Sequence, residues 1–361
     1  MKAAYIVKHP LQGSRYKHGV MFSRVCEVDH VDAIPRDNDY RFAIVRGDHS
    51  KDFEKAQRAG LPYLLIQHDV WSVRAGLPRC DDEERMMRGA SAILYTSEHH
   101  HDLSERYSDL PYSEVVHLRP FRKDLDFTPL PKLPGRNIVY AGGIVGKDGS
   151  DMFGYRKYHR IFAELMKCGW TVHLYPAWGA VERGVEYAEM GCIVHDPVSQ
   201  SDLYRELSQY QVGFQGYARV GPQAYIRSCR PNKLWEYLAA GIPTFGYNTG
   251  TGSHLYEGRW GYVAKSLKAF PETLEKVAAM SIPLELRYEQ TIDGDEDAFR
   301  RLVEHVDMFA PQPPEHTYTL SRKVHPFTFM GRHWNPGDSI THSQALAMKD
   351  AGHIAGNGLR A

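Results

Sequence analysis

The stretch that most constrains the fold is Pro231–Tyr247, which reads PNKLWEYLAAGIPTFGY. Its proline fits the first turn of a helix, and the side chain of Asn232 can cap the backbone amides there. The pattern predicts a helix over residues 233–240 that ends at Gly241 in the left-handed conformation. Residues 242–247 then read as a buried strand. The stretch therefore predicts one helix–strand unit of an α/β sheet.

One face of this helix is polar. Asn232, Lys233 and Glu236 lie three or four positions apart and share that face. The carboxylate can accept hydrogen bonds from two ribose hydroxyls, while the ammonium group and the helix N-terminus favour phosphate anions. The alternative is an ordinary amphipathic helix with one solvent-exposed ion pair. Spacing alone does not distinguish a nucleotide site from that alternative.

Composition is that of a soluble globular protein. The 361 residues suffice for two domains, and 42% hydrophobic with 24% charged residues is a normal content. The formal net charge is zero, so a nucleic acid or an anionic membrane would need a local basic patch. No apolar run approaches the ~20 residues that span a bilayer, and five cysteines without CxxC spacing predict reduced thiols. We therefore expect a cytoplasmic protein without integral membrane association.

Alternating strands and helices predict two α/β halves. The expected strands are at 3–7, 42–45, 63–67, 92–95 and 115–118, then at 137–140, 171–175, 192–194, 212–215, 242–247 and 262–263. Residues 13–19 read as a loop before a helix over 20–28, and 216–228 as an irregular loop over the ligand. We predict an N-terminal domain over 1–127, a linker over 128–136, a second domain over 137–310, and a tail or small appended module over 311–361.

A glycine-rich turn follows the first strand of the second half. Gly142 and Gly143 come directly after this strand, and Lys147 and Arg156 lie before the next helix. Backbone amides at such a turn approach a diphosphate closely, and either cation can neutralise it. The dinucleotide fingerprint G-x-G-x-x-G is absent. Together with the polar helix, the turn predicts a nucleotide diphosphate site.

His68 and Asp69 stand at the carboxyl end of the strand predicted over 63–67. A carboxylate there is well placed to act as general base toward an acceptor hydroxyl, provided that the hydroxyl lies within hydrogen-bond reach. His68 is the alternative base, or a contact to the donor. Asp69 is alternatively a helix N-cap.

The sequence predicts no required metal. Asp37, Asn38 and Asp39 spell a D-x-D motif, but they precede a strand and read as a turn. Three consecutive histidines at 99–101 point in three directions around a helix, which makes a poor metal site.

The string PNKLWEYLAAGIPTF resembles the donor-site signature of GT-B glycosyltransferases, an (N)K-x-x-E-Y-x-A-x-G-x-P run with a ribose-binding glutamate. The resemblance extends over roughly residues 1–310 and implies two Rossmann-like domains that face each other. It implies a UDP-sugar donor and no tightly bound cofactor. Glu236 then takes the place of the ribose-binding glutamate. The donor contacts expected are Gly142, Gly143, Lys147, Arg156, His195, Asn232, Lys233 and Glu236, with His195 near the base.

Two subgroups compete. The retaining family-4 type pairs two glutamates as E-x7-E, and its earlier position is Ser228 here. The bacteriophage DNA β-glucosyltransferases are inverting enzymes that act on hydroxymethylated bases, and their order of features is similar. The similar features are Asn38-Asp39-Tyr40 before a strand, Asp69 after one, the turn at Tyr140, Gly142 and Gly143, and the pair Trp235-Glu236.

The expected reaction moves a hexose, glucose above all, from a UDP-sugar to an acceptor hydroxyl. The specific acceptor expected is a hydroxymethylated base in bacteriophage DNA, which would place the protein in the host cytoplasm. The acceptor contacts expected are Arg15, Lys17, His18, Arg74 and Arg122. The alternatives are a polysaccharide or glycolipid transferase, a nucleotide-sugar 2-epimerase, and a non-catalytic nucleotide-sugar-binding protein. The oligomeric state stays open.

Overall fold

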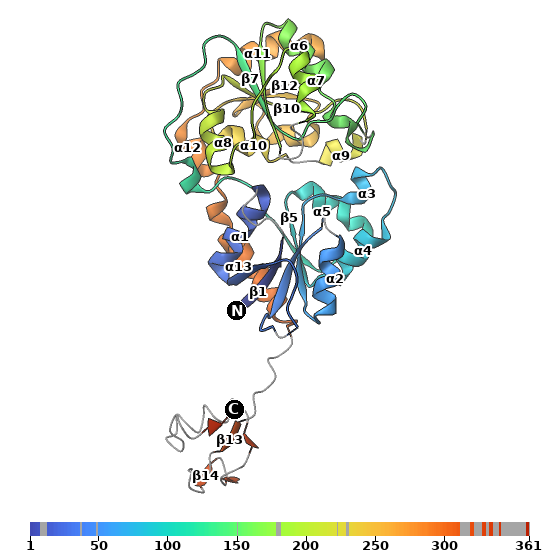
Figure 1. The fold of residues 1–361 in the computed structure, drawn as a ribbon, viewed down its shortest axis with the longest axis vertical. Coiled ribbons are helices and arrows are strands. Elements are labelled where there is room, and N and C mark those ends of the chain that lie inside the picture. The colour runs from blue at the N-terminus through green and yellow to red at the C-terminus, as the bar shows by residue number, and fades with distance from the viewer. Residues whose placement is uncertain are drawn as a thin grey trace. The chain divides into compact units, whose positions relative to one another are not determined.

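The computed structural model describes residues 1–7, 13–36, 38–47, 50–149, 151–177, 182–221, 223–228 and 231–310, and five short strands beyond them. Contacts divide the chain into two units, Met1–Phe309 and Ala310–Ala361. The first unit contains two six-stranded sheets (Figure 1). Among the described residues, no helix has the length and apolar character needed to cross a membrane.

The first sheet is parallel throughout and has the strand order β2-β1-β3-β4-β5-β6. Its strands are β1 (Lys2–Ile6), β2 (Glu27–Val31), β3 (Phe42–Arg46), β4 (Tyr63–Gln67), β5 (Ala92–Tyr95) and β6 (Tyr112–Val115). Its helices are α1 (Gly13–Val25), α2 (Ser50–Arg58), α3 (Trp71–Arg74), α4 (Asp81–Gly89) and α5 (Glu98–Ser104), with 3-10 turns η1 (Glu105–Tyr107) and η2 (Arg122–Leu125). The central strands β3 and β4 are buried at every position, as expected when helices cover both faces of a sheet.

The start of the first domain differs from the prediction. The expected loop over 13–19 is the beginning of α1, which ends at Val25 rather than at 28. Contact with a helix from the end of the unit stabilises this glycine-containing segment as a helix. The edge strand β2 was not predicted, because Glu27, Asp29 and His30 hide its apolar alternation.

The second sheet is also parallel, with the order β12-β11-β10-β7-β8-β9. Its strands are β7 (Asn137–Gly142), β8 (Thr171–Pro176), β9 (Ile193–Val194), β10 (Val212–Gly216), β11 (Thr244–Tyr247) and β12 (Gly261–Ala264). Its helices are α6 (His159–Lys167), α7 (Gly184–Glu189), α8 (Gln200–Leu207), α9 (Gln223–Ser228), α10 (Lys233–Ala239), α11 (Phe270–Ala278) and α12 (Leu284–Glu289). Short 3-10 turns are η3 (Asp151–Arg156), η4 (Gly250–Leu255), η5 (Leu267–Ala269) and η6 (Ile292–Asp295). The expected α/β class with two Rossmann-like domains is confirmed.

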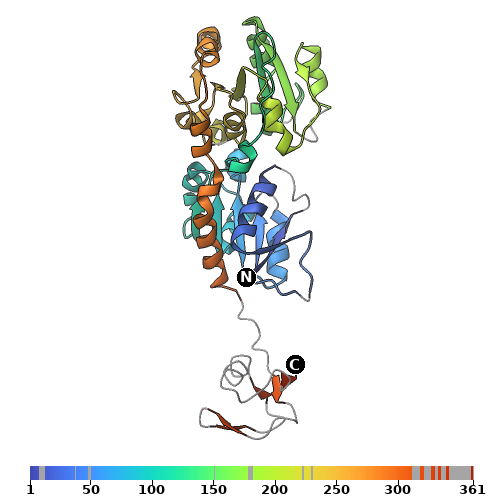
Figure 2. The ribbon, with the colours of Figure 1, turned by 90° about the vertical axis from the view of Figure 1, so that its left-hand side faces the viewer.

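The last helix of the unit, α13 (Glu296–Asp307), returns to the first sheet. Figure 2 shows it in orange beside the blue first domain. Phe299, Leu302 and Val306 are buried in the same core as Tyr5 of β1. The predicted boundary at 310 had placed this helix with the second sheet, so the structure differs from the prediction here.

A second link between the two sheets is α9, inside the stretch predicted as an irregular loop. This helix contacts α3 and α5 of the first domain. Tyr225 and Ile226 of α9 form an apolar cluster with Val70 and Val73 from the first domain and with Tyr155. The loop prediction missed α9 because this helix is short and is held by contacts between domains.

The signature helix α10 runs as predicted and ends before Gly241, whose φ is +70°. One detail of the prediction is wrong. Asn232 occupies the N-cap position, but its φ and ψ of −56° and −32° are helical and its side chain makes no capping hydrogen bond.

The second unit contains only short described strands. β13 (Tyr318–Leu320) pairs antiparallel with β16 (Ser339–Ile340) and β17 (Leu359–Arg360). β14 (Phe327–Phe329) pairs antiparallel with β15 (Arg332–Trp334).

Candidate active site

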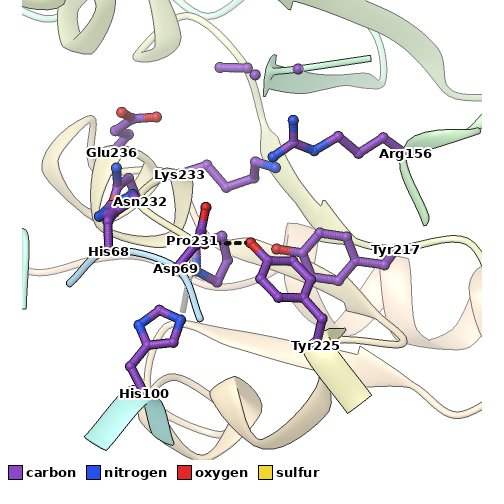
Figure 3. Close-up of a pocket in the computed structure, with 13 residues that line it drawn as sticks. His68, Asp69, His100, Arg156, Tyr217, Tyr225, Pro231, Asn232, Lys233 and Glu236 are labelled. Atoms are coloured by element: carbon purple, nitrogen blue, oxygen red, sulfur yellow. Dashed lines mark hydrogen bonds between the residues drawn. The ribbon is translucent and has the colours of Figure 1, made fainter. Parts of the chain in front are cut away.

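A cavity of ≈ 230 Å³ lies between the two domains of the first unit, at the carboxyl ends of strands from both sheets. Ligands of open α/β sheets bind at such strand ends. The cavity is lined by His68, Asp69, His100, Ala141, Gly142, Gly143, Arg156, Tyr217, Tyr225, Pro231, Asn232, Lys233 and Glu236 (Figure 3). It thus brings together eight of the ten predicted catalytic and donor-binding residues.

Two cations pack on the glycine turn that ends β7. A Cβ atom at Gly142 would lie 3.4 Å from Cε of Lys233, and the φ of this glycine is +143°. A Cβ atom at Gly143 would lie 2.8 Å from Nη1 of Arg156. Figure 3 shows the charged ends of Lys233 and Arg156 turned toward each other. A side chain at the turn would displace these charged groups, so glycine permits their convergence.

Tyrosines surround both cations. Nζ of Lys233 donates a 3.1 Å hydrogen bond to the hydroxyl of Tyr140 and lies 4.3 Å from the centre of its ring. Burial alone would lower the pKa of Arg156, but the neighbouring hydroxyls, that of Tyr155 foremost, raise it overall. Both side chains therefore present positive charge to the cavity beside backbone amides, which is the arrangement that a diphosphate requires.

Glu236 lies one turn beyond Lys233 on α10 and also lines the cavity. Lys17 of α1 interacts electrostatically with Glu236 from the first domain, and its Nζ donates a 3.1 Å hydrogen bond to the carbonyl oxygen of Leu118. Burial lowers the pKa of Lys17, while the negative charges of Glu236 and Asp124 oppose that effect. Lys17 is 3% exposed. It was predicted as an acceptor contact, but it is a buried neighbour of Glu236.

Both carboxylate oxygens of Asp69 accept short hydrogen bonds. Nη1 of Arg74 donates to Oδ2 at 2.7 Å. The hydroxyl of Tyr225 donates to Oδ1 at 2.7 Å, as Figure 3 shows. Burial would raise the pKa of Asp69, but the charges of His68 and Arg74 and the hydrogen bond from Tyr225 lower it overall. A carboxylate held in this way is a weak base.

Two histidines complete this side of the cavity. His68 follows β4, and His100 belongs to α5, whose first turn follows β5. Nδ1 of His100 lies 3.3 Å from Oγ1 of Thr96. In the sequence, His100 stands out only as part of the histidine run at 99–101. The signal that could have found it is the pairing of the neighbouring strands β4 and β5, whose carboxyl ends meet at one sheet edge.

Two predicted donor contacts lie outside the cavity. Lys147 is exposed, and its backbone amide donates a 2.8 Å hydrogen bond to Oε2 of Glu186. His195 stacks on the ring of Tyr175, and its Nε2 lies 3.0 Å from Nδ1 of His173. Of the two cations proposed for the glycine turn, the structure therefore brings Arg156 to it.

The predicted acceptor residues do not gather into one exposed basic surface. His18 is fully buried, like Lys17, and Arg15 is half-buried. Arg74 forms an ion pair with Asp69. Arg122 alone is exposed, with its guanidinium carbon 4.9 Å from the centre of the Tyr288 ring.

The predicted loop over 216–228 does supply the cavity wall, through Tyr217 and Tyr225. Neither tyrosine had been named in advance, because aromatic side chains carry no distinctive spacing there. Residues 229 and 230 and the side chain of Ser228, the position of the missing first glutamate, lie outside the described part of the chain.

Within the described residues, no three His, Cys, Asp or Glu side chains are placed to hold a metal ion. Of the D-x-D residues, Asp37 is outside the described part. Asn38 and Asp39 precede β3, and Asp39 forms a 3.0 Å ion pair with Lys2. Lys2 therefore engages the carboxylate that a D-x-D metal motif would need.

No protein-family model and no curated protein sequence matches the chain. Solved structures do match. A sucrose-phosphate synthase from Thermosynechococcus elongatus aligns at 12% identity with a TM-score of 0.58, over 86% of this chain and 97% of that one. WaaG, a glycosyltransferase involved in lipopolysaccharide biosynthesis, aligns at 10% identity with a TM-score of 0.53, over 85% and 99%.

A third similar structure is an alpha-glucosyltransferase in complex with UDP and a 13-mer DNA containing an HMU base. It aligns at 15% identity with a TM-score of 0.49, over 86% of this chain and 94% of that one. The first two alignments, with the two facing parallel sheets, show the fold. The chain has the GT-B fold of glycosyltransferases, as the signature in α10 predicted.

Proposed function

We propose that the protein is a glycosyltransferase that takes a hexose from a UDP-sugar. The observation that carries this proposal is the convergence of Arg156 and Lys233 on the Gly142–Gly143 turn, with Glu236 in the same cavity. The two cations and the turn amides bind the diphosphate, and the carboxylate of Glu236 accepts hydrogen bonds from the ribose hydroxyls.

Positive charge at the diphosphate also assists the chemical step. As the bond from the anomeric carbon to the phosphate oxygen breaks, the electron pair leaves with the diphosphate, where Arg156 and Lys233 stabilise the growing charge. Because these groups are already in place, they do not have to reorganise during the reaction. Their effect is larger in the transition state than with the intact donor.

The state of Asp69 favours retention of the anomeric configuration. An inverting enzyme needs a general base for the acceptor hydroxyl, whereas both oxygens of Asp69 are occupied and its pKa is lowered. In a retaining reaction the acceptor proton passes to the departing phosphate oxygen on the same face of the sugar. We assign Asp69 a positioning role. His68 is the described cavity residue that would serve as base if the reaction inverts.

For the acceptor we propose a hydroxymethylated base in duplex DNA as the first candidate. This part rests on the sequence resemblance at the glycine turn and at Trp235-Glu236. The described part of the chain adds no exposed basic surface made from the predicted acceptor residues, so glycans and lipids remain the alternative acceptors.

The test is the release of UDP from UDP-glucose, with hydroxymethylated duplex DNA, unmodified duplex DNA or no acceptor. Release that only the modified DNA stimulates supports both reaction and acceptor. Slow release that DNA does not stimulate supports UDP-glucose as the donor and rejects hydroxymethylated DNA as the acceptor. No release from UDP-, GDP- or ADP-sugars contradicts the proposal as stated.

The anomeric outcome is read from the product by NMR. An α-linked glucose from the α-linked donor supports retention, and a β-linked glucose contradicts it. The His68→Ala variant separates the two cases, because it should abolish only an inverting transfer.

A further inference from the structure

A second, larger cavity lies in the second domain, and none of its lining residues lines the donor cavity. Its volume is ≈ 480 Å³, within the range of small-molecule pockets. It is formed by Lys157 and the first turn of α6, by the last residue of β11, and by the segments that follow β10 and β12, so it too lies at the carboxyl edge of a parallel sheet. The lining residues are Lys157, Arg160, Ile161, Ala218, Arg219, Val220, Tyr247, Lys265, Ser266, Leu267 and Lys268.

The lining is strongly basic. Five of these residues are Lys or Arg, and none of the described lining residues is acidic. Two cations of this domain that lie outside the cavity, Lys167 of α6 and Lys276 of α11, pair with Glu164 at 3.3 Å and with Glu272 at 2.8 Å. Like charges gathered around one concave site repel each other and focus a positive potential into it. A bound anion would offset that repulsion.

The base of the cavity is apolar. Ile161 and Ala218 are 3% and 8% exposed, and Tyr247 is 6% exposed. The guanidinium carbon of Arg219 lies 5.7 Å from the centre of the Tyr247 ring, which holds this cation over an aromatic face. A ligand that fits therefore combines a flat or apolar part with more than one negative charge.

The cavity is distinct from the donor cavity, although the two share a wall. Arg156 and Tyr217 line the donor cavity, whereas their chain neighbours Lys157 and Ala218 line the second one. The backbone amide of Ala218 donates a 2.9 Å hydrogen bond to the carbonyl oxygen of Tyr155, which joins the two segments of this wall.

We propose that this cavity binds a small organic phosphate with two or more negative charges, separately from the sugar donor. The cations around the rim bind the phosphates, and the apolar part lies against Ile161 and Tyr247. A free nucleotide, a nucleic acid backbone and a lipid headgroup share the phosphate chemistry. The volume of the cavity and its apolar base favour the small free ligand.

The test is calorimetric titration of the full-length protein with thymidine 3′,5′-bisphosphate, in a Lys233→Gln background that weakens the donor cavity. Adding Arg160→Gln and Lys268→Gln should weaken binding at least about tenfold, since each removes a charge-assisted contact. The matched control adds Lys167→Gln and Lys276→Gln, which removes two cations from α6 and α11 outside the cavity and should leave the affinity within about twofold.

Equal affinities of the two variants, or no binding of the bisphosphate to the parent protein, would overturn the proposal. So would binding of duplex DNA or of phosphatidylglycerol vesicles through Arg160 and Lys268 when the bisphosphate does not bind. A parallel titration with UDP, with Lys233 intact, keeps the two sites apart. The UDP affinity of the donor cavity, which is the affinity that Lys233→Gln weakens, should be unchanged by Arg160→Gln with Lys268→Gln, so failure of the donor proposal and failure of this one give different results.

Discussion

The hydroxyl of Tyr225 donates a 2.7 Å hydrogen bond to Oδ1 of Asp69 and thereby joins α9 of the second domain to the end of β4 in the first. Arg74 holds the other oxygen of the same carboxylate. The guanidinium of Arg74 in turn lies 4.8 Å from the centre of the Phe153 ring, in the segment that leads to Arg156. The carboxylate therefore connects the two domains directly beside the donor cavity.

Asp69→Asn and Tyr225→Phe should each destabilise the domain contact by about 1–3 kcal/mol, because a hydrogen bond to a charged group is lost. If Asp69 is a positioning residue, both variants should lower the transfer rate to a similar degree, about tenfold or less. Urea unfolding and steady-state kinetics measure the two effects. A loss of about 1,000-fold or more in Asp69→Asn alone, with stability unchanged, would instead identify Asp69 as the base.

The same carboxylate gives a pH dependence. The pKa of Asp69 is lowered below its ordinary value of 3.8 in the folded protein, so its contribution is fully present above the unfolded pKa. That contribution is lost as the pH falls through the folded pKa. The wild-type protein should therefore lose more stability than Asp69→Asn below about pH 4, as measured by urea unfolding at stepwise pH. Parallel curves would contradict this.

Gly143→Ala should weaken UDP binding at least about tenfold, because its Cβ atom would meet Nη1 of Arg156 at 2.8 Å and displace a phosphate contact. Gly294→Ala is the matched control, since no atom lies within 4 Å of its added Cβ. The control should bind UDP as the wild type does. Equal affinities of the two variants would show that Arg156 is not fixed by the turn.

The site around α10 could be predicted because its signals are local. Proline, asparagine and glycine marked its ends, and the spacing of Lys233 and Glu236 placed both on one face. The glycine turn was found for the same reason. The sequence could not show which of Arg156 and Lys147 contacts the glycine turn, because both follow it. Only the path of η3 brings Arg156 back to Gly143.

Contacts between domains were the part that could not be predicted. Tyr225 meets Asp69 across 156 positions of sequence, and α13 crosses to the first sheet after the second is complete. Neither relationship has a periodic signature. The buried position of Lys17 was missed because residues 13–19 were predicted as a loop, where a lysine is usually solvated.

Glu236→Gln should remove the preference of the site for a ribose over a deoxyribose. The carboxylate accepts hydrogen bonds from hydroxyls, and an amide offers a weaker acceptor of the same size. The wild type should bind UDP at least about tenfold more tightly than 2′-deoxy-UDP or 3′-deoxy-UDP, and the variant should not discriminate. Calorimetry with the three nucleotides measures this. An unchanged preference in Glu236→Gln would remove the ribose role.

His173 gives a second pH test. Burial, and then the charge of His195, lower the pKa of His173 from 6.5 to about 4. The unfolded chain therefore binds more protons between these two values, so this residue reduces stability as the pH falls through that window, by up to ~3 kcal/mol. In thermal unfolding at stepwise pH, the stability of His173→Gln should therefore fall less than that of the wild type as the pH is lowered through this window. An identical slope in variant and wild type would contradict a buried neutral imidazole.

The central claim is that Lys233 and Arg156, on the glycine turn, hold a nucleotide diphosphate. The most direct measurement is the Kd of UDP for the wild type, Lys233→Gln and Lys147→Gln. Each variant loses one lysine: Lys233 packs on the turn in space, whereas Lys147 only follows it in sequence. We predict a loss of about tenfold or more for Lys233→Gln and less than about twofold for Lys147→Gln, which lies outside the cavity. Equal losses, or a larger loss in Lys147→Gln, would contradict the account.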